Sequence, residues 1–112
     1  ACTACGGVLK PDVVFFGESV PPGRVEAAWA LYETADVLLV AGSSLTVYSG
    51  YRFVLRAAKD GVPVVIVNLG PTRGDAKAVH CLSGRTGHVL PRLAQALTYG
   101  YALTPHTPAT RR

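Results

Sequence analysis

The chain has 112 residues, of which 49% are hydrophobic and only 16% are charged, against about 25% charged residues in a typical globular domain. This length allows one domain and argues against two packed cores. The composition excludes a disordered chain and a coiled coil, and the longest apolar runs fall far short of the about 20 residues that a membrane span needs.

The net charge of +4 is unevenly distributed along the sequence. After Asp75 the chain contains five basic residues and no acidic one. A dense basic stripe with interleaved aromatic rings is typical of nucleic-acid binding, whereas these five charges are spread over the last 37 residues. We therefore expect a solvated helix and tail at this end, with no nucleic-acid partner and no membrane contact.

The cysteine pattern and the first residues bear on the cellular compartment. Three cysteines, with Cys2 and Cys5 close together, do not form an ordinary disulfide framework. The start of the sequence also has none of the charged, then apolar, then small-residue order of a secretory signal. Both features favour a reducing compartment. We expect the cytoplasm, or the mitochondrial matrix if the source is eukaryotic.

The first predicted elements are a strand and a helix. Val13–Phe16 is a short β-prone run that Gly17 stops. Pro21 and Pro22 then separate it from a helix predicted over residues 24–35, in which apolar residues recur at the spacing of one helical face. The residues predicted on that face are Val25, Ala28, Trp29, Tyr32 and Ala35.

Two buried strands are predicted next. Val37–Ala41 and Val62–Val67 are continuous apolar runs of strand length, as parallel strands covered on both faces require. A helix predicted over residues 50–60 separates them, and Gly61 is placed to end it. The inner face of that helix is predicted to hold Tyr51, Val54, Leu55 and Ala58.

A third helix is predicted over residues 88–98, with Pro91 tolerated only in its first turn. Strands that alternate with helices through short turns predict an α/β fold with a parallel sheet. Because only two strands are convincing, the chain corresponds to half of a doubly wound domain. The tail from Thr104 to Arg112 has no periodicity. The inner face of the third helix is predicted to hold Leu90, Leu93, Ala94 and Leu97.

Cys2-x-x-Cys5, followed by Gly6 and Gly7, favours a metal knuckle over a redox motif. Two thiolates at this spacing bind one Zn²⁺, and the glycines let backbone N–H groups turn toward the sulfurs. A redox pair needs a helix that begins at the cysteines, and the Lys-Pro that follows does not continue one. Since tetrahedral zinc takes four ligands, the sequence predicts half of a site.

The other cysteine and the three histidines are assigned no chemistry. Cys81, next to His80, is interpreted as a core or loop residue, and the same interpretation applies to His80 itself. Neither His80 nor His88 has an acidic partner in the sequence pattern, and His106 lies in the tail. We therefore assign a catalytic role to none of them.

Polar residues stand at the ends of both predicted strands. Gly42-Ser43-Ser44 follows the first strand, and Asn68 follows the second. Carboxyl ends of parallel strands share one edge of the sheet, where open α/β sheets bind ligands. Hydroxyl groups at such an edge suit phosphate and ribose, although a plain helix cap and a turn-forming asparagine are simpler alternatives. A serine-hydrolase elbow is disfavoured, because Thr46 stands where a glycine is needed.

Taken together, these motifs closely resemble the C-terminal half of a sirtuin, an NAD-dependent protein-lysine deacylase. The resemblance runs from Cys2 to about Leu93, and residues 47–53 and 68–73 are most similar to the class II branch. The motifs that carry it are Cys2-x-x-Cys5-Gly-Gly-x-Leu-Lys-Pro-Asp-Val-Val-Phe-Phe-Gly-Glu18, Ala35-Asp36-x-Leu-Leu-Val-x-Gly-Ser-Ser-Leu45 and Val67-Asn68.

The resemblance implies a domain organisation and a set of binding residues. It divides the chain into residues 1–23, the second half of a zinc-binding module with the substrate strand, 24–99, the C-terminal half of a Rossmann-like NAD-binding domain, and 100–112, a loose tail. Cys2 and Cys5 become the second pair of ligands at a zinc site. The strand that pairs with an acylated-lysine substrate peptide contains Val14, Phe15, Gly17 and Glu18. The residues implied to bind NAD are Gly42, Ser43, Ser44, Asn68, Leu69, Gly70 and Thr86.

Several family motifs would all precede Cys2: a Gly-Ala-Gly loop, a Gln-Asn-x-Asp motif, the catalytic His and the first cysteine pair. The resemblance implies that this His is the general base on the NAD ribose, which lets the acyl oxygen attack C1′. We therefore assign no catalytic residue, expect the missing N-terminal half of the fold as a partner, and expect no activity from these 112 residues alone. A non-catalytic NAD- or ADP-ribose-binding remnant and a zinc-linked interaction module stay open as alternatives.

Overall fold

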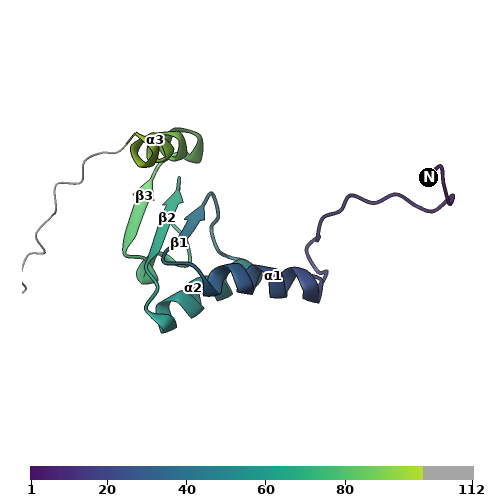
Figure 1. Ribbon diagram of the computed structural model, residues 1–112, viewed down its shortest axis with the longest axis horizontal. Coiled ribbons are helices and arrows are strands. Elements are labelled where there is room, and N and C mark those ends of the chain that lie inside the picture. The colour runs from purple at the N-terminus through teal and green to yellow at the C-terminus, as the bar shows by residue number, and fades with distance from the viewer. Residues whose placement is uncertain (100–112) are drawn as a thin grey trace, which may run out of the picture. The chain divides into compact units, whose positions relative to one another are not determined.

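The computed structural model describes residues 1–99, so the tail predicted over residues 100–112 lies outside the described residues. Two compact units divide the chain, the first over Ala1–Thr34 and the second beginning at Ala35. The order of elements, which Figure 1 shows, is α1 (Pro22–Glu33), β1 (Leu38–Ala41), α2 (Tyr48–Asp60), β2 (Val64–Asn68), the 3-10 helix η1 (Asp75–Lys77), β3 (His80–Ser83) and α3 (Thr86–Thr98).

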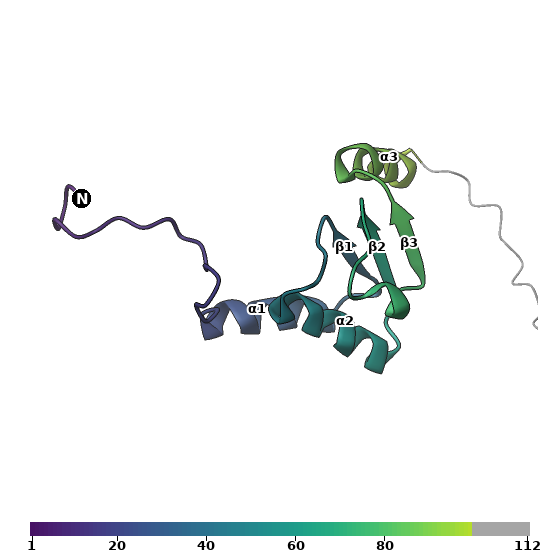
Figure 2. The same ribbon diagram turned by 180° about the vertical axis from the view of Figure 1, so that it is seen from behind.

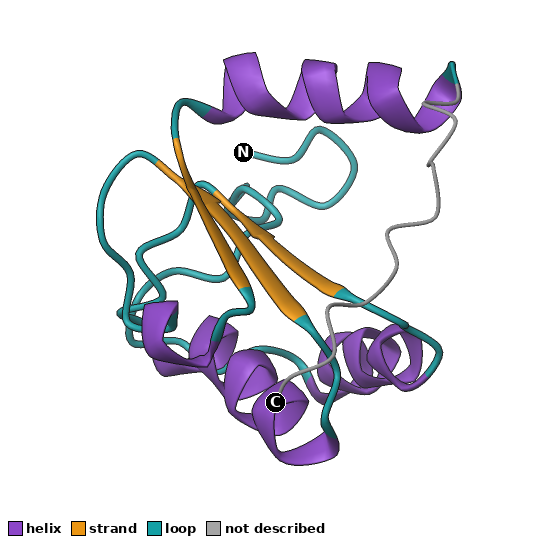
Figure 3. Ribbon diagram, turned by 90° about the vertical axis from the view of Figure 1, so that its left-hand side faces the viewer, coloured by secondary structure: helices purple, strands orange, loops and turns teal. Residues whose placement is uncertain are grey.

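The second unit is built on a three-stranded parallel sheet in the order β1-β2-β3. Figure 2 shows the same order from behind. Helices α2 and α3 lie on opposite sides of this sheet (Figure 3). The predicted α/β fold with a parallel sheet is thus confirmed. The helices lie on both sides because strands that carry apolar residues toward both faces need a helix on each face.

Strand β2 is the centre of the core. Val64, Ile66 and Val67 are almost completely buried, whereas Leu39 in β1 keeps 44% of its surface exposed. The prediction that Val37–Ala41 is buried on both faces is therefore wrong. The physical reason is its position, since among the described strands β1 has a neighbour on one side only.

Strand β3 is an element that the sequence analysis missed. All four of its residues are exposed, and they form neither an alternating pattern nor an apolar run. The strand is held by parallel backbone pairing, with His80 opposite Val65 and Cys81 opposite Ile66. The interpretation of His80 and Cys81 as core or loop residues is thus wrong, because backbone hydrogen bonds rather than side-chain burial define this strand.

The strand predicted at Val13–Phe16 is absent from the described residues. The chain turns at Phe16 and Gly17, and all four predicted strand residues are exposed. A β-strand needs a partner for its backbone N–H and C=O groups, and none of the three strands of the sheet pairs with this segment.

Helices α1 and α2 follow the predicted apolar periodicity. In α1, Trp29 meets Tyr32 edge-on with ring centroids 5.5 Å apart. The five residues of the predicted face are the only ones between 24 and 36 that are not exposed, although the helix begins at Pro22 and ends at Glu33, so that Ala35 lies beyond it. Helix α2 ends where predicted, at Gly61 with a left-handed φ of +75°. Its buried face contains Ala57 in place of the predicted Ala58, which is exposed.

Helix α3 begins two residues earlier than predicted, at Thr86. Pro91 consequently lies in the second turn rather than the first, where it cannot donate the hydrogen bond that the Gly87 carbonyl would accept. The face also differs, because Ala94 and Leu97 are exposed. Val89 packs against Gly84, where a Cβ atom would lie 3.0 Å from the Val89 Cγ2. The half-buried residues of α3 include Val89, Leu90, Leu93 and Ala96.

None of the helices within residues 1–99 combines the length and the apolar character that crossing a membrane requires.

The central position of β2 leads to a test of the core. Ile66→Ala should lower the free energy of unfolding by about 2–5 kcal/mol, because truncation of a fully buried side chain leaves a cavity. Leu97→Ala is the matched control, since Leu97 is 77% exposed. Urea denaturation followed by circular dichroism measures both, and equal losses in the two variants would contradict the assignment of β2 as the core strand.

Candidate functional site

The carboxyl ends of the three strands meet at one edge of the sheet. The Gly42 N–H donates a hydrogen bond of 2.9 Å to the carbonyl of Val67, at the end of the neighbouring strand. The Gly84 N–H donates one of 3.1 Å to the carbonyl of Asn68. These two bonds tie the segments that follow β1 and β3 to the end of β2.

A pocket of about 260 Å³ opens at this edge. Helix α3 begins beside it at Thr86, and its N-cap residue, Arg85, makes no side-chain hydrogen bond to the helix. The first N–H groups of a helix carry a partial positive charge. A pocket at this place therefore suits an anionic group such as a phosphate. The residues that line it are Gly42, Asn68, Leu69, Gly84, Arg85 and Thr86.

Glycine is favoured at position 42 by its backbone conformation. Its φ of +65° lies in the left-handed region that side chains other than glycine rarely adopt. A Cβ atom there would lie 3.4 Å from the Thr86 Cγ2, an ordinary contact, so lack of space is not the reason. The glycine thus lets the chain turn out of β1 while it passes close to the start of α3.

The structure brings together four of the seven residues predicted to bind NAD, since Gly42, Asn68, Leu69 and Thr86 all line this pocket. Ser43, Ser44 and Gly70 do not line it.

The residues outside the pocket make bonds within their own segments. In the loop that follows β1, the Ser43 Oγ accepts from the Leu45 N–H at 3.2 Å, and the Ser44 Oγ lies 2.9 Å from the Thr46 Oγ1. The Asn68 side-chain amide donates to the Gly70 carbonyl at 2.9 Å, which orients Asn68. The ligand contacts of all seven residues stay predictions.

Sequence reasoning missed Gly84 and Arg85, which complete the pocket. Gly84 follows β3 directly, and Arg85 precedes α3. A glycine between a strand and a helix is the same signal that identified Gly42. It was not recognised because β3 itself lacks an apolar pattern.

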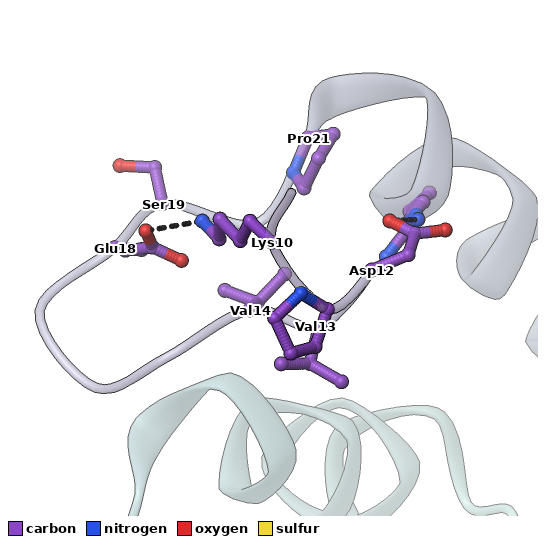
Figure 4. Close-up of a pocket in the computed structure, with 9 residues that line it drawn as sticks. Lys10, Asp12, Val13, Val14, Glu18, Ser19 and Pro21 are labelled. Atoms are coloured by element: carbon purple, nitrogen blue, oxygen red, sulfur yellow. Dashed lines mark hydrogen bonds and ion pairs between the residues drawn. The ribbon is translucent and has the colours of Figure 1, made fainter. Parts of the chain in front are cut away.

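In the first unit, the segment from Lys10 to Glu18 closes into a loop (Figure 4). The Lys10 Nζ lies 2.6 Å from the Glu18 Oε1, and the Phe15 N–H donates to the Glu18 Oε2 at 2.9 Å. Both contacts favour the ionised carboxylate, so they lower the pKa of Glu18 below its ordinary value, with Lys10 as the larger cause. A second ion pair of 2.6 Å, between Arg24 and Asp12, joins this loop to α1.

The predicted substrate residues occupy this loop in different ways. Val14 and Glu18 line an open pocket of about 570 Å³ together with Lys10, as Figure 4 shows. Phe15 and Gly17 instead form a turn, in which the Glu18 N–H donates to the Phe15 carbonyl at 3.0 Å. The φ of +85° at Gly17 matches the third position of a type II turn.

The cysteine pair adopts a tight turn of the kind that a metal knuckle requires. The Gly6 N–H donates to the Cys2 carbonyl, and the Cys2 N–H donates to the Gly7 carbonyl, both at 2.8 Å. Backbone N–H groups of Ala4 and Cys5 bond the Cys2 sulfur and lower the pKa of its thiol, and the Cys5 side chain adds to this effect. The donors thus fit two corners of a zinc site, although residues 1–99 contain no cluster of three or more potential ligands.

The third cysteine lies in the second unit. The Cys81 Sγ is 3.8 Å from the Asp75 Oδ1. Desolvation by neighbouring atoms raises the pKa of the Cys81 thiol although the residue is exposed, and the negative charge of Asp75 raises it further. A thiol in this state is a poor metal ligand and nucleophile, so its surroundings do not resemble those of Cys2.

The fold and this edge of the sheet define a class of protein: α/β proteins with a Rossmann-like sheet that bind ligands at the carboxyl ends of parallel strands. The family described as Sir2 matches residues 1–49. A solved structure titled as Sir2 with a p53 peptide and NAD⁺ superposes with a TM-score of 0.75 at 31% identity, over 88% of this chain and 41% of that one.

Curated relatives agree with this match. The chain is 55% identical over 97 residues to "NAD-dependent protein deacetylase 1" of Mycobacterium avium, which covers 87% of this chain and 34% of the relative. It is 54% identical over 91 residues to "NAD-dependent protein lipoamidase sirtuin-4, mitochondrial" of Bos taurus, which covers 81% and 29%. The chain thus spans about a third of the length of these relatives. Its first 49 residues match the Sir2 family, the sirtuins, and the resemblance to a portion of a sirtuin, stated from the sequence motifs, is confirmed.

The Lys10–Glu18 contact predicts a pH dependence of the first unit. Because the pKa of Glu18 lies below its ordinary value of 4.5, the carboxylate stabilises the loop above that pH, and this contribution disappears as the pH falls through the lowered pKa. In an NMR titration of the side-chain carboxyl carbon, the midpoint should lie below 4.5 and should rise in the variant Lys10→Gln. Lys59→Gln is the control, and an unchanged midpoint in Lys10→Gln would contradict the assignment.

Proposed function

We propose that these 112 residues form the C-terminal portion of an NAD-dependent protein-lysine deacylase and supply part of its cofactor, substrate and zinc sites. The single observation that carries this proposal is the pocket where the ends of β1, β2 and β3 converge, in a chain whose first 49 residues match the Sir2 family. Relatives named as NAD-dependent deacetylases support the choice of reaction.

In this proposal the pocket holds the adenosine end of NAD. Gly42 and Gly84 let the cofactor approach the backbone closely, because neither presents a side chain to it. Asn68, oriented by the Gly70 carbonyl, offers polar atoms to the ribose. The start of α3 at Thr86 lines the same pocket, and the first N–H groups of a helix favour negative charge. The chain's own contribution is therefore to bind and orient the cofactor, while the proton transfer belongs to the catalytic His that the resemblance places before Cys2.

We further propose that the loop of the first unit receives the acylated peptide. Val13 and Val14 are exposed and make no strand pairing within the described sheet. The Val13 N–H donates to the Pro11 carbonyl at 2.8 Å, so pairing with an extended peptide, the β-augmentation mode of recognition, would exchange this bond for one to the peptide. The turn at Gly17 and the Lys10–Glu18 ion pair would hold this segment in place.

Zinc is proposed as a structural ion that Cys2 and Cys5 hold at two of its four positions. The bound ion would fix the turn at the start of the chain and has no role in the reaction. The cytoplasmic location and the class II branch also stay predictions.

The division of roles leads to a kinetic prediction for the complete gene product that contains this chain. Asn68→Ala and Ser43→Ala should raise KM for NAD about three- to tenfold, because Asn68 lines the pocket and the Ser43 hydroxyl holds the adjoining loop through the Leu45 N–H. They should leave KM for the acyl-peptide within about twofold. Val14→Ala and Gly17→Ala should instead raise KM for the peptide. Steady-state assays that vary each substrate separately measure this, and the reverse pattern would contradict the proposal.

The zinc proposal is tested by elemental analysis of the same gene product after dialysis. The wild type should hold about one zinc per chain, and Cys2→Ser and Cys5→Ser should lose most of it. Cys81→Ser is the matched control, because Cys81 bonds Asp75 instead, and it should retain the metal. Full retention of zinc in Cys2→Ser would rule out this residue as a ligand.

A further inference from the structure

Leu45, in the loop that follows β1, has an unusual backbone conformation. It is the only residue besides glycine with a positive φ, +58°, among residues 1–99. Left-handed backbone is costly for a side chain with a Cβ and persists only where surrounding contacts enforce it. Leu45 is nevertheless 95% buried, with 5% of its surface exposed. Something in the second unit must therefore hold this side chain in place.

Gly74 supplies the space that Leu45 occupies. A Cβ atom on Gly74 would lie 2.7 Å from the Leu45 Cδ1, and 3.3 Å from both the Ile66 Cδ1 and the Val54 Cγ1. The backbone angles of Gly74, φ −93° and ψ −4°, lie at negative φ in a region that residues other than glycine also adopt in turns. Glycine is therefore needed here for space and not for conformation.

Arg73 binds the loop that contains Leu45 through backbone and side-chain hydrogen bonds. Its N–H donates to the Ser44 carbonyl at 2.9 Å, and its Nη1 donates to the Thr46 carbonyl at 3.4 Å. Its guanidinium carbon also lies 4.2 Å from the ring centroid of Tyr51 on α2, a cation–π contact. One exposed side chain thus connects the loop to the helix that follows it.

The segment that carries Arg73 and Gly74 is itself fixed. Asp75 accepts hydrogen bonds from the Thr72 N–H at 3.0 Å and from the Thr72 hydroxyl. The Gly74 N–H in turn donates to the Thr72 Oγ1 at 3.2 Å. These contacts give the loop after β1 a rigid surface to pack against.

We infer that Leu45, Arg73 and Gly74 form a lock that presets the loop over residues 42–46, which makes Arg73 and Gly74 positioning residues for the pocket although neither lines it. Gly42 lines the pocket three positions before Leu45. A loop already held in its bound conformation does not lose freedom when the ligand binds, and this raises affinity. The inference rests on the proposed function, because it names NAD as the ligand that benefits.

The first test compares two glycine-to-alanine variants in the complete gene product. In Gly74→Ala, the new methyl group displaces Leu45, so amide hydrogen exchange over residues 43–46 should accelerate at least about tenfold. KM for NAD should rise by a similar factor, with KM for the acyl-peptide unchanged. Gly50→Ala is the matched control, because its Cβ would lie 3.9 Å from the Leu45 Cδ2, an ordinary contact. It should change neither quantity.

A second test avoids the core altogether. Arg73 is exposed, so Arg73→Ala should leave the fold intact while it raises KM for NAD about two- to tenfold and accelerates exchange in the loop. Arg73→Lys, which keeps the positive charge near Tyr51, should restore part of both. Arg56→Gln removes an exposed ion pair with Asp60 at the end of α2 and serves as the control.

Exchange over residues 43–46 that is unchanged in both Gly74→Ala and Arg73→Ala would overturn the lock. So would a rise in KM for the peptide as large as that for NAD. The exchange comparison uses no cofactor, so accelerated exchange supports the lock even in a wild-type protein without NAD-dependent activity. That lack of activity would contradict the proposed function alone.

Discussion

The parallel pairing of β2 with strands on both sides is the interaction on which the rest of the second unit depends. It buries Val64, Ile66 and Val67 and sets the register of β1 and β3. The same pairing aligns the three strand ends, since the Gly42 and Gly84 N–H groups bond to Val67 and Asn68. The pocket is thus a direct consequence of backbone hydrogen bonding, and its lining residues come from segments up to 44 positions apart, from Gly42 to Thr86.

Elements with a strong side-chain pattern could be predicted from the sequence. The apolar run in β2, the face of α1 and the end of α2 at Gly61 all express burial or a special backbone angle, and both leave a mark on residue type. Gly42 and Asn68 could be placed at one edge of the sheet, because each directly follows a predicted parallel strand. The edge strand β1 was predicted too deeply buried, because an apolar run does not reveal how many neighbours a strand has.

Features that depend on backbone pairing or on contacts between distant residues could not be predicted. Strand β3 has four exposed residues, so nothing in its composition distinguishes it from a loop, and Gly84 and Arg85 were missed with it. The opposite error arose at Val13–Phe16, where β-prone residues have no partner strand in the described sheet. The space that Gly74 leaves for Leu45 is likewise invisible in the sequence, because it joins residues 29 positions apart.

The central claim is that the ends of β1, β2 and β3 form one nucleotide-binding edge. A crystal structure of the complete gene product with bound ADP-ribose tests it most directly. The account predicts the adenosine in contact with Gly42, Asn68 and Thr86, with Gly84 and Arg85 completing the wall of the pocket. ADP-ribose bound away from all of these residues would contradict it.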